Sequence, residues 1–235
     1  MIRMLRLNQI TKEYGGQRVL NIPQLDIPKG ESFGLVGNNG AGKTTLFRII
    51  LDLIKVNSGS VHSKEVDVAG SEHWKAYTGS YLDEGFLIDF LTPEEYFQFV
   101  GAINGLSTGD IDDFMHRFDS FFDGEILAKK KYIRDFSKGN QKKIGISAAI
   151  MTQPELLVLD EPFSNLDPST QIRLKKLLRS LQEEQKVTML ISSHDLNHVT
   201  EVCDRIVVLD HGDLVHDIQT SASTLKDLEA YFAVE

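Results

Sequence analysis

The sequence predicts an α/β fold: a doubly wound, mostly parallel sheet with an antiparallel β part at the N-terminus and an inserted helical sub-domain. Short Val/Ile/Leu runs at 156–159, 187–191 and 206–209 alternate with segments of helical periodicity. This alternation is typical of parallel strands joined by right-handed crossovers. A β-rich opening with turn residues precedes them, and the strand pattern stops between 86 and 134, where aromatic residues are dense.

The first fifty residues contain strand patterns before a helical one. The expected elements are strands near 5–10, over 19–27 and over 32–36, and a helix over 46–53. Pro28-Lys29-Gly30 closes the second strand, and Asn57-Ser58-Gly59 ends the helix. The third strand is a short apolar run next to a glycine, which suits a strand buried on both faces. Residues 61–81 mix short strand patterns with polar turns and give no clear assignment.

The aromatic-rich stretch is interpreted as a helical sub-domain inserted over approximately residues 86–150. Thr92-Pro93-Glu94-Glu95 predicts a helix start, because it supplies a capping hydroxyl, a proline at the first position and carboxylates in the first turn. A helical stretch follows over 141–151. Further along, leucines on one face predict a helix over 172–181 between two strands.

The composition restricts the class of protein. The chain has 235 residues, 25 Lys and Arg against 34 Asp and Glu, a net charge of −9 and one cysteine. One cysteine excludes a disulfide framework and a Cys-rich zinc site. The acidic balance argues against nucleic acid as a partner. No apolar run reaches the roughly 18–20 residues that span a bilayer, and the start lacks a secretory signal. We expect a single cytoplasmic domain over 1–235.

A phosphate-loop motif, G-x-x-x-x-G-K-[ST], lies between the third strand and the first helix, in the context that it requires. Its glycines let backbone N–H groups point inward, and the helix aims its positive dipole end at the same point. Lys43 would reach the β- and γ-phosphates of a bound nucleotide, and Thr44 would hold Mg²⁺. The alternative is a Gly-rich turn with an incidental lysine. The expected nucleotide contacts are Gly37, Asn38, Asn39, Gly40, Ala41, Gly42, Lys43, Thr44 and Thr45.

Two carboxylates, Asp160 and Glu161, follow the apolar run 156–159. Ligands of open α/β sheets bind at this end of the strands. Asp160 can hold Mg²⁺, and Glu161 can polarise an attacking water as a general base. Many strands stop at polar turns, so the pair is informative because a phosphate loop accompanies it. The predicted fold is therefore that of a P-loop NTPase.

The stretch Phe136-Ser137-Lys138-Gly139-Asn140-Gln141 precedes the predicted 141–151 helix. A serine hydroxyl and free N–H groups at a helix start form an anion site, to which Lys138, Lys142 and Lys143 would add charge. With this stretch the chain resembles the nucleotide-binding subunit of ABC transporters, whose signature is LSGGQ. The alternative is a capped helix with a basic face. Phe136, Lys138 and Asn140 depart from the signature, whereas Ser137 and Gly139 match it.

The resemblance implies that two nucleotide-binding domains meet head to tail and close on ATP. Ser137, Gly139 and Asn140 would then cap the nucleotide held by the other subunit. Asp167, in Ser164-Asn165-Leu166-Asp167, would contact that subunit, and it is also a plain N-cap before Pro168.

Further residues take family roles by resemblance. Tyr14 would stack on adenine, or it is a tyrosine in a surface turn. His194 would contact the γ-phosphate as a catalytic residue, although histidines after strands are often structural. Glu84 aligns with a family glutamine and, as a carboxylate, can still coordinate Mg²⁺. Cys203 is expected to be a small buried hydrophobe.

The resemblance implies an ATPase subunit that powers a separate membrane permease from the cytoplasmic face, paired with an identical or different nucleotide-binding subunit. Within this family, the chain is most similar to compact bacterial exporter-type (ABC-2-like) subunits. Phe86, Leu87 and Phe90 would form the docking patch for the permease, or equally the core of the sub-domain. Two alternatives are a soluble single-cassette ABC ATPase acting in assembly and a nucleotide-binding switch with little turnover.

Overall fold

The computed structural model describes residues 2–233, so the domain predicted over 1–235 includes three residues outside the described part. These residues form a ten-stranded sheet in the order β5-β4-β1-β2-β10-β9-β3-β8-β7-β6. The strands are β1 (Arg3–Tyr14), β2 (Gln17–Pro28), β3 (Ser32–Val36), β4 (Ser58–Ser63), β5 (Val66–Asp67), β6 (Thr78–Tyr81), β7 (Leu156–Leu159), β8 (Thr188–Ser193), β9 (Arg205–Asp210) and β10 (Asp213–Gln219).

Helices cover the sheet, and none of those within residues 2–233 is long and apolar enough to cross a membrane. The α-helices are α1 (Lys43–Ile50), α2 (Pro93–Ile103), α3 (Thr108–Arg117), α4 (Asp119–Phe122), α5 (Lys138–Met151), α6 (Pro168–Gln185), α7 (Leu196–Val202) and α8 (Thr224–Phe232). The short 3-10 helices are η1 (His73–Tyr77), η2 (Glu84–Phe86) and η3 (Ile133–Asp135).

The sheet has an antiparallel part and a parallel part, as the sequence predicts. β1 pairs antiparallel with β2 and β4. In the other half, β3 lies parallel between β8 and β9, and β7 lies parallel between β8 and β6. Every residue of β3, β7 and β8 is buried, which explains the apolar run in each of these strands. The parallel strands all end at one edge, where the polar motifs follow.

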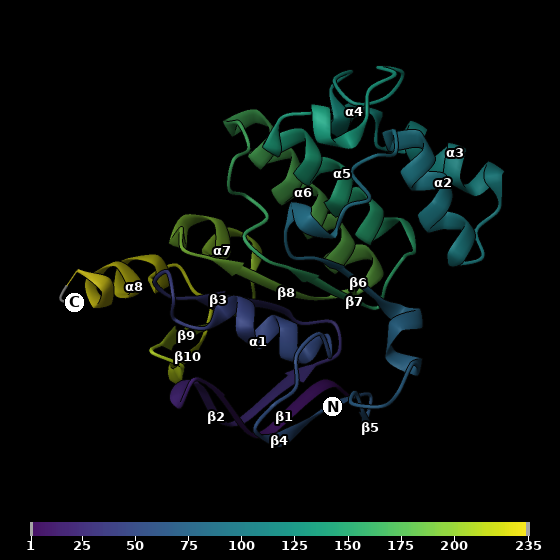
Figure 1. The fold of residues 1–235 in the computed structure, drawn as a ribbon. Coiled ribbons are helices and arrows are strands. Elements are labelled where there is room, and N and C mark those ends of the chain that lie inside the picture. Colours follow the sequence, from purple (N-terminus) through teal and green to yellow (C-terminus); the bar gives the residue numbers. More distant parts are fainter. Residues whose placement is uncertain (1, 234–235) are drawn as a thin grey trace.

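Two hydrophobic clusters fill the two sides of the parallel strands. One contains Leu46, Phe47 and Ile50 of α1 together with apolar residues of β1 and β2. Figure 1 shows α1 between these antiparallel strands and the parallel strands. The other cluster joins α5 and α6 to the aromatic residues of α2, α3 and α4. These last three helices gather at the end of the molecule away from β1, β2 and β4 (Figure 1).

The first helix does not run over the predicted 46–53 but over Lys43–Ile50. It begins inside the phosphate-loop motif, because Gly42 is its N-cap in the left-handed conformation (φ 109°). It ends earlier because Asp52 is also left-handed (φ 50°) and Leu53 is 48% exposed. The apolar spacing beyond Ile50 therefore belongs to a turn.

The aromatic-rich segment is helical, as predicted. Thr92 caps α2 and forms a capping box with Glu95. Phe97 packs against Phe114 and Phe122, with ring centroids 6.0 and 5.8 Å apart. The residues 86–90 have mixed environments: Leu87 belongs to the core, whereas Phe86 and Phe90 are 53% and 61% exposed. The core interpretation is confirmed for Leu87, whereas the docking patch stays a prediction for Phe86 and Phe90.

Candidate functional site

The phosphate loop follows β3 and opens onto a cavity of about 350 Å³, lined by residues 38–45, Val19 and Glu161. Gly37 lies so close to β9 that a Cβ atom would overlap the Leu209 carbonyl group. Gly40 and Gly42 have φ values of 86° and 109°, which side chains of other residues disfavour. The glycines of the motif are therefore required by the shape of the loop.

Lys43 reaches back into the loop that precedes it. Its side chain is 7% exposed, and Nζ donates to the carbonyl oxygens of Gly37 at 2.6 Å and Asn38 at 3.4 Å. The same Nζ lies 3.6 Å from Oε1 of Glu161. The ammonium group thus lies at the loop, where phosphate oxygens would compete for it.

Thr44 and Asp160 connect the loop to the end of β7. The Thr44 hydroxyl donates to Asp160 Oδ2 at 2.5 Å, and the Ser192 hydroxyl donates to Asp160 Oδ1. A hydroxyl beside a carboxylate is a donor set that Mg²⁺ accepts together with substrate phosphates and waters. Residues 2–233 contain no group of three or more His, Cys, Asp or Glu side chains suited to hold a metal by themselves. The donor set therefore fits a metal ion that binds along with phosphates.

Glu161 lies between two cationic or potentially cationic groups. Its Oε2 is 2.9 Å from Nδ1 of His194, while its Oε1 faces Lys43. The backbone of Glu161 is left-handed, with φ 47°, which is unusual for a residue other than glycine. Its N–H donates to Ser192 Oγ at 2.9 Å. The structure thus brings together Lys43, Glu161 and His194, which are far apart in the sequence.

Glu84 is 22% exposed and lies near the start of α5. Tyr81 donates its hydroxyl to Glu84 Oε1 at 3.1 Å, and Lys138 Nζ is 3.9 Å from Oε2. Burial, with the neighbouring charge of Glu84, raises the pKa of the Tyr81 phenol far above its usual value. This phenol therefore remains a hydrogen-bond donor to the carboxylate at every physiological pH.

The signature-like stretch forms the start of α5. Ser137 is the exposed N-cap, and its Oγ accepts the N–H of Asn140 at 3.2 Å. A Cβ atom on Gly139 would stand 2.7 Å from the carbonyl oxygen of Asn165. The first turn of α5 therefore packs directly against the 164–167 segment, and Gly139 permits that close approach.

The prediction that Lys142 and Lys143 add charge to this helix start is wrong. They are 4% and 3% exposed, because α5 is buried on nearly all sides after its first turn. Lys142 Nζ bonds Glu161 and Ser164, and Lys143 Nζ pairs with Glu125 at 3.0 Å. Of the three lysines, Lys138 stays exposed at the helix start.

Tyr14 and Asp167 lie in simple local environments. Tyr14 ends β1 and is 50% exposed, with Lys12 Nζ 4.8 Å from its ring centroid. Asp167 is the N-cap of α6, as predicted, and accepts the N–H groups of Ser169 and Thr170, both at 3.0 Å. Hydrogen bonds from Ser169 and Thr170 hold the pKa of Asp167 well below its ordinary value. An adenine contact for Tyr14 and an intersubunit contact for Asp167 stay predictions.

Cys203 is buried, as predicted, with its thiol pKa raised by burial. Ser192 was not among the predicted site residues, although its hydroxyl contacts the Asp160 carboxylate and the backbone N–H of Glu161. The sequence alone carries no signal for this contact, because it depends on the parallel register in which Leu159 of β7 pairs with Ile191 of β8. The next residues, Asp160 and Ser192, must therefore meet at the sheet edge.

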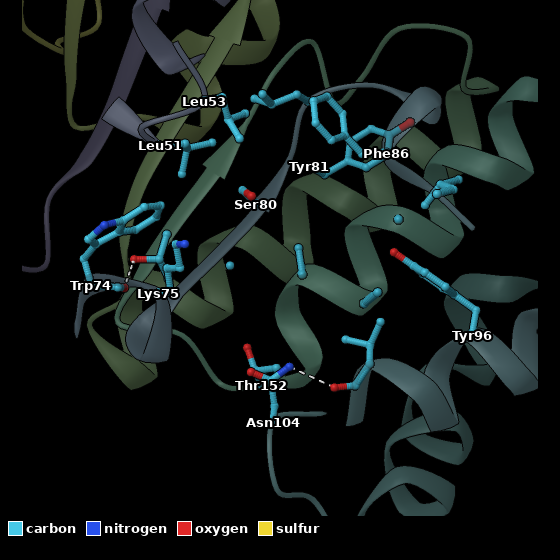
Figure 2. A pocket seen from close by; sticks show the side chains of 18 of the residues that line it. Leu51, Leu53, Trp74, Lys75, Ser80, Tyr81, Phe86, Tyr96, Asn104 and Thr152 are labelled. Atoms are coloured by element: carbon cyan, nitrogen blue, oxygen red, sulfur yellow. Dashed lines mark hydrogen bonds between the residues drawn. The ribbon is translucent and has the colours of Figure 1, made fainter. Parts of the chain in front are cut away.

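A second cavity, of about 370 Å³, lies between the core of the fold and the aromatic helices. Figure 2 shows Trp74 and Tyr96 on opposite sides of it, with Leu53 and Phe86 near its edge. Leu53 and Phe86 are about half exposed. This groove is lined by the turn after α1 and by residues of η1, β6, η2, α2 and α5. Tyr81, which contacts Glu84, is one of its lining residues.

The chain is similar to known proteins over most of its length. The family model described as ABC transporter matches residues 20–164. The chain is 35% identical over 213 residues to the ABC transporter ATP-binding protein YhaQ of Bacillus subtilis, which covers 89% of this chain and 69% of that protein. It is 33% identical over 220 residues to the bacitracin transport ATP-binding protein BcrA of Enterococcus faecalis, and this match covers 93% of this chain and 70% of BcrA. The ATP-binding cassette MJ0796, in a dimeric post-hydrolysis state with ADP and phosphate, shares the fold: TM-score 0.83, 23% identity, 93% of this chain and 100% of that chain covered.

Proposed function

This chain belongs to the ABC transporter family as an ATP-binding subunit, and from that membership we propose that its ATP hydrolysis drives a separate membrane permease. The observation that carries the proposal is the position of Glu161. Its carboxylate lies 3.6 Å from Lys43 Nζ and 2.9 Å from His194 Nδ1, beside the phosphate-loop cavity. A general base must lie within reach of the water that attacks the γ-phosphate.

In this proposal the loop residues 37–45 bind the phosphates of ATP through their N–H groups and Lys43. Thr44 and Asp160 would hold Mg²⁺, with Glu84 as a further candidate ligand, and the ion would neutralise phosphate charge. Glu161 takes a proton from the attacking water. His194 positions the Glu161 carboxylate and donates a hydrogen bond to the γ-phosphate. The side chains support this proposal by already lying at one sheet edge.

A second nucleotide-binding subunit, identical or different, completes the site. Ser137, Gly139 and Asn140 lie at the start of α5, where the exposed N-cap can accept an anion from another subunit. Tyr14 stacks on adenine, and Asp167 belongs to the segment that contacts the second subunit. ATP favours the closed pair, because both anion sites are used only there.

The permease docks at the groove shown in Figure 2. Its edge carries the half-exposed Leu53 and Phe86, and an apolar segment of a membrane protein can cover such side chains. We assign residues 86–150 to a helical sub-domain that moves with the permease. This arrangement puts the subunit at the cytoplasmic face of the membrane as a peripheral protein.

The test is purification of the tagged chain from detergent-solubilised membranes of its own host. We expect a co-purifying multispan protein and ATP turnover that is absent in Lys43→Ala, since that substitution removes the ammonium group at the loop. The matched control is Lys226→Ala, an exposed lysine of α8 that does not line the loop cavity. An active ATPase with no membrane partner would instead support a soluble cassette acting in assembly.

A further inference from the structure

Lys142 is a buried lysine at the centre of the site that the family resemblance did not single out. It lies in α5, and the residue is 4% exposed. Its Nζ donates to the carbonyl oxygen of Glu161 at 2.8 Å and to Ser164 Oγ at 2.6 Å. Ser164 Oγ in turn donates to the same Glu161 carbonyl oxygen at 2.9 Å. One ammonium group thus connects α5 to the backbone of Glu161 and to the 164–167 segment.

A buried ammonium group is costly unless it is paired or hydrogen-bonded. Burial lowers the pKa of Lys142, and the charges of Glu84, Glu161 and Asp160 oppose that shift. Glu84 begins η2, and Asp160 and Glu161 directly follow β7. Lys142 is therefore a buried hydrogen-bond donor of the site rather than a surface charge.

The backbone that Lys142 contacts is held in an unfavourable conformation. Glu161 has φ 47°, and a residue other than glycine stays left-handed only where its surroundings fix it. Its N–H is fixed by Ser192 Oγ, and its carbonyl oxygen is fixed by Lys142 and Ser164. Both ends of this residue are thus determined by side chains from other elements.

We propose that Lys142 is a positioning residue that fixes the backbone of Glu161 and so makes the placement of its carboxylate depend on α5. This inference rests on the proposed function, in which Glu161 is the base. The start of α5 carries Ser137 and Gly139, the residues proposed to meet the second subunit. A displacement of α5 on subunit closure is transmitted through one side chain to the hydrolytic carboxylate.

The experiment compares Lys142→Met with Lys143→Met in the assembled, membrane-extracted complex. Both lysines are buried neighbours in α5, but Lys143 pairs with Glu125 outside the site. We expect Lys142→Met to lower kcat by about 100-fold, as for a misplaced reacting group, while the Kd of a fluorescent ATP analogue stays unchanged. Lys143→Met is expected to keep its kcat. Lys142→Arg, which retains a cationic donor, recovers part of the rate.

A double-mutant cycle separates positioning from general structural loss. In a Glu161→Gln background, the residual single-turnover rate with radiolabelled ATP should not fall further when Lys142→Met is added. An equal further loss in that background, or a normal kcat in Lys142→Met, overturns the proposal. If Lys142→Met does not fold, Ser164→Ala decides: reduced kcat with unchanged Kd supports the proposal, and normal kcat overturns it. Absence of turnover in the unmodified complex would instead refute the proposed function.

Discussion

Gly139→Ala tests the close packing between the start of α5 and the 164–167 segment. The new Cβ atom would stand 2.7 Å from the Asn165 carbonyl oxygen, and it must retreat by about 0.7 Å to reach ordinary contact at 3.4 Å. The obstacle is a backbone atom, so a side-chain rotation does not relieve it. Overpacking of this kind costs about 1–3 kcal/mol, and the better helix propensity of alanine offsets about 1 kcal/mol.

The net expectation is a loss of about 0–2 kcal/mol, which lowers Tm by up to about 8 °C in a domain of this size. The matched control is Gly109→Ala in α3, an exposed helical glycine whose Cβ would meet nothing closer than Ser107 Oγ at 3.8 Å. This variant should gain up to about 1 kcal/mol from helix propensity. Differential scanning calorimetry measures both, and ATP turnover should fall at least about tenfold in Gly139→Ala alone, because the start of α5 is displaced. Equal changes in Tm for the two variants would refute the packing argument.

Three other substitutions address the proposed cycle and the local capping. Glu161→Gln should retain nucleotide binding but accumulate an ATP-bound dimer, seen by size-exclusion chromatography; a monomer with ATP would count against the base assignment. Ser137→Arg should bind nucleotide normally in fluorescence titrations yet lose turnover by about 100-fold or more, as for a lost anion-site donor; normal turnover would contradict the two-subunit site. Asp167→Ala should lower Tm through the loss of a cap of about 1 kcal/mol. Folding lowers the pKa of Asp167, so the contribution of its carboxylate to the free energy of unfolding is present at neutral pH and is lost as the pH falls below the ordinary aspartate range. The difference in Tm between the unmodified protein and Asp167→Ala should therefore narrow in acid.

The sequence predicted the parts of the fold that depend on local pattern. The strands β3 and β7 are short apolar runs followed by polar motifs, and both occur where their sequences indicate. The Thr92 helix start is confirmed because its capping chemistry lies within four consecutive residues. Residues 61–81 could not be assigned, since β5 has two residues and both are exposed, so neither length nor burial leaves a pattern.

The parts of the site that depend on tertiary packing and strand pairing were not predictable from the sequence. The sequence pattern placed Lys142 and Lys143 at a basic helix start. Packing of α5 buries both side chains instead. The contact between Ser192 and Asp160 requires the pairing of β7 with β8. Glu84 was placed by alignment with the family, and its contacts with Tyr81 and Lys138 emerged from the fold.

The two hydrophobic clusters on opposite sides of the parallel strands stabilise different helices. α1, which follows the phosphate loop, is stabilised by one of them, and α5 by the other. Sub-global opening reactions generally follow such packing units. Amide exchange in native buffer should therefore resolve two protection levels, one for the packing unit that contains α1 and one for the unit that contains α5.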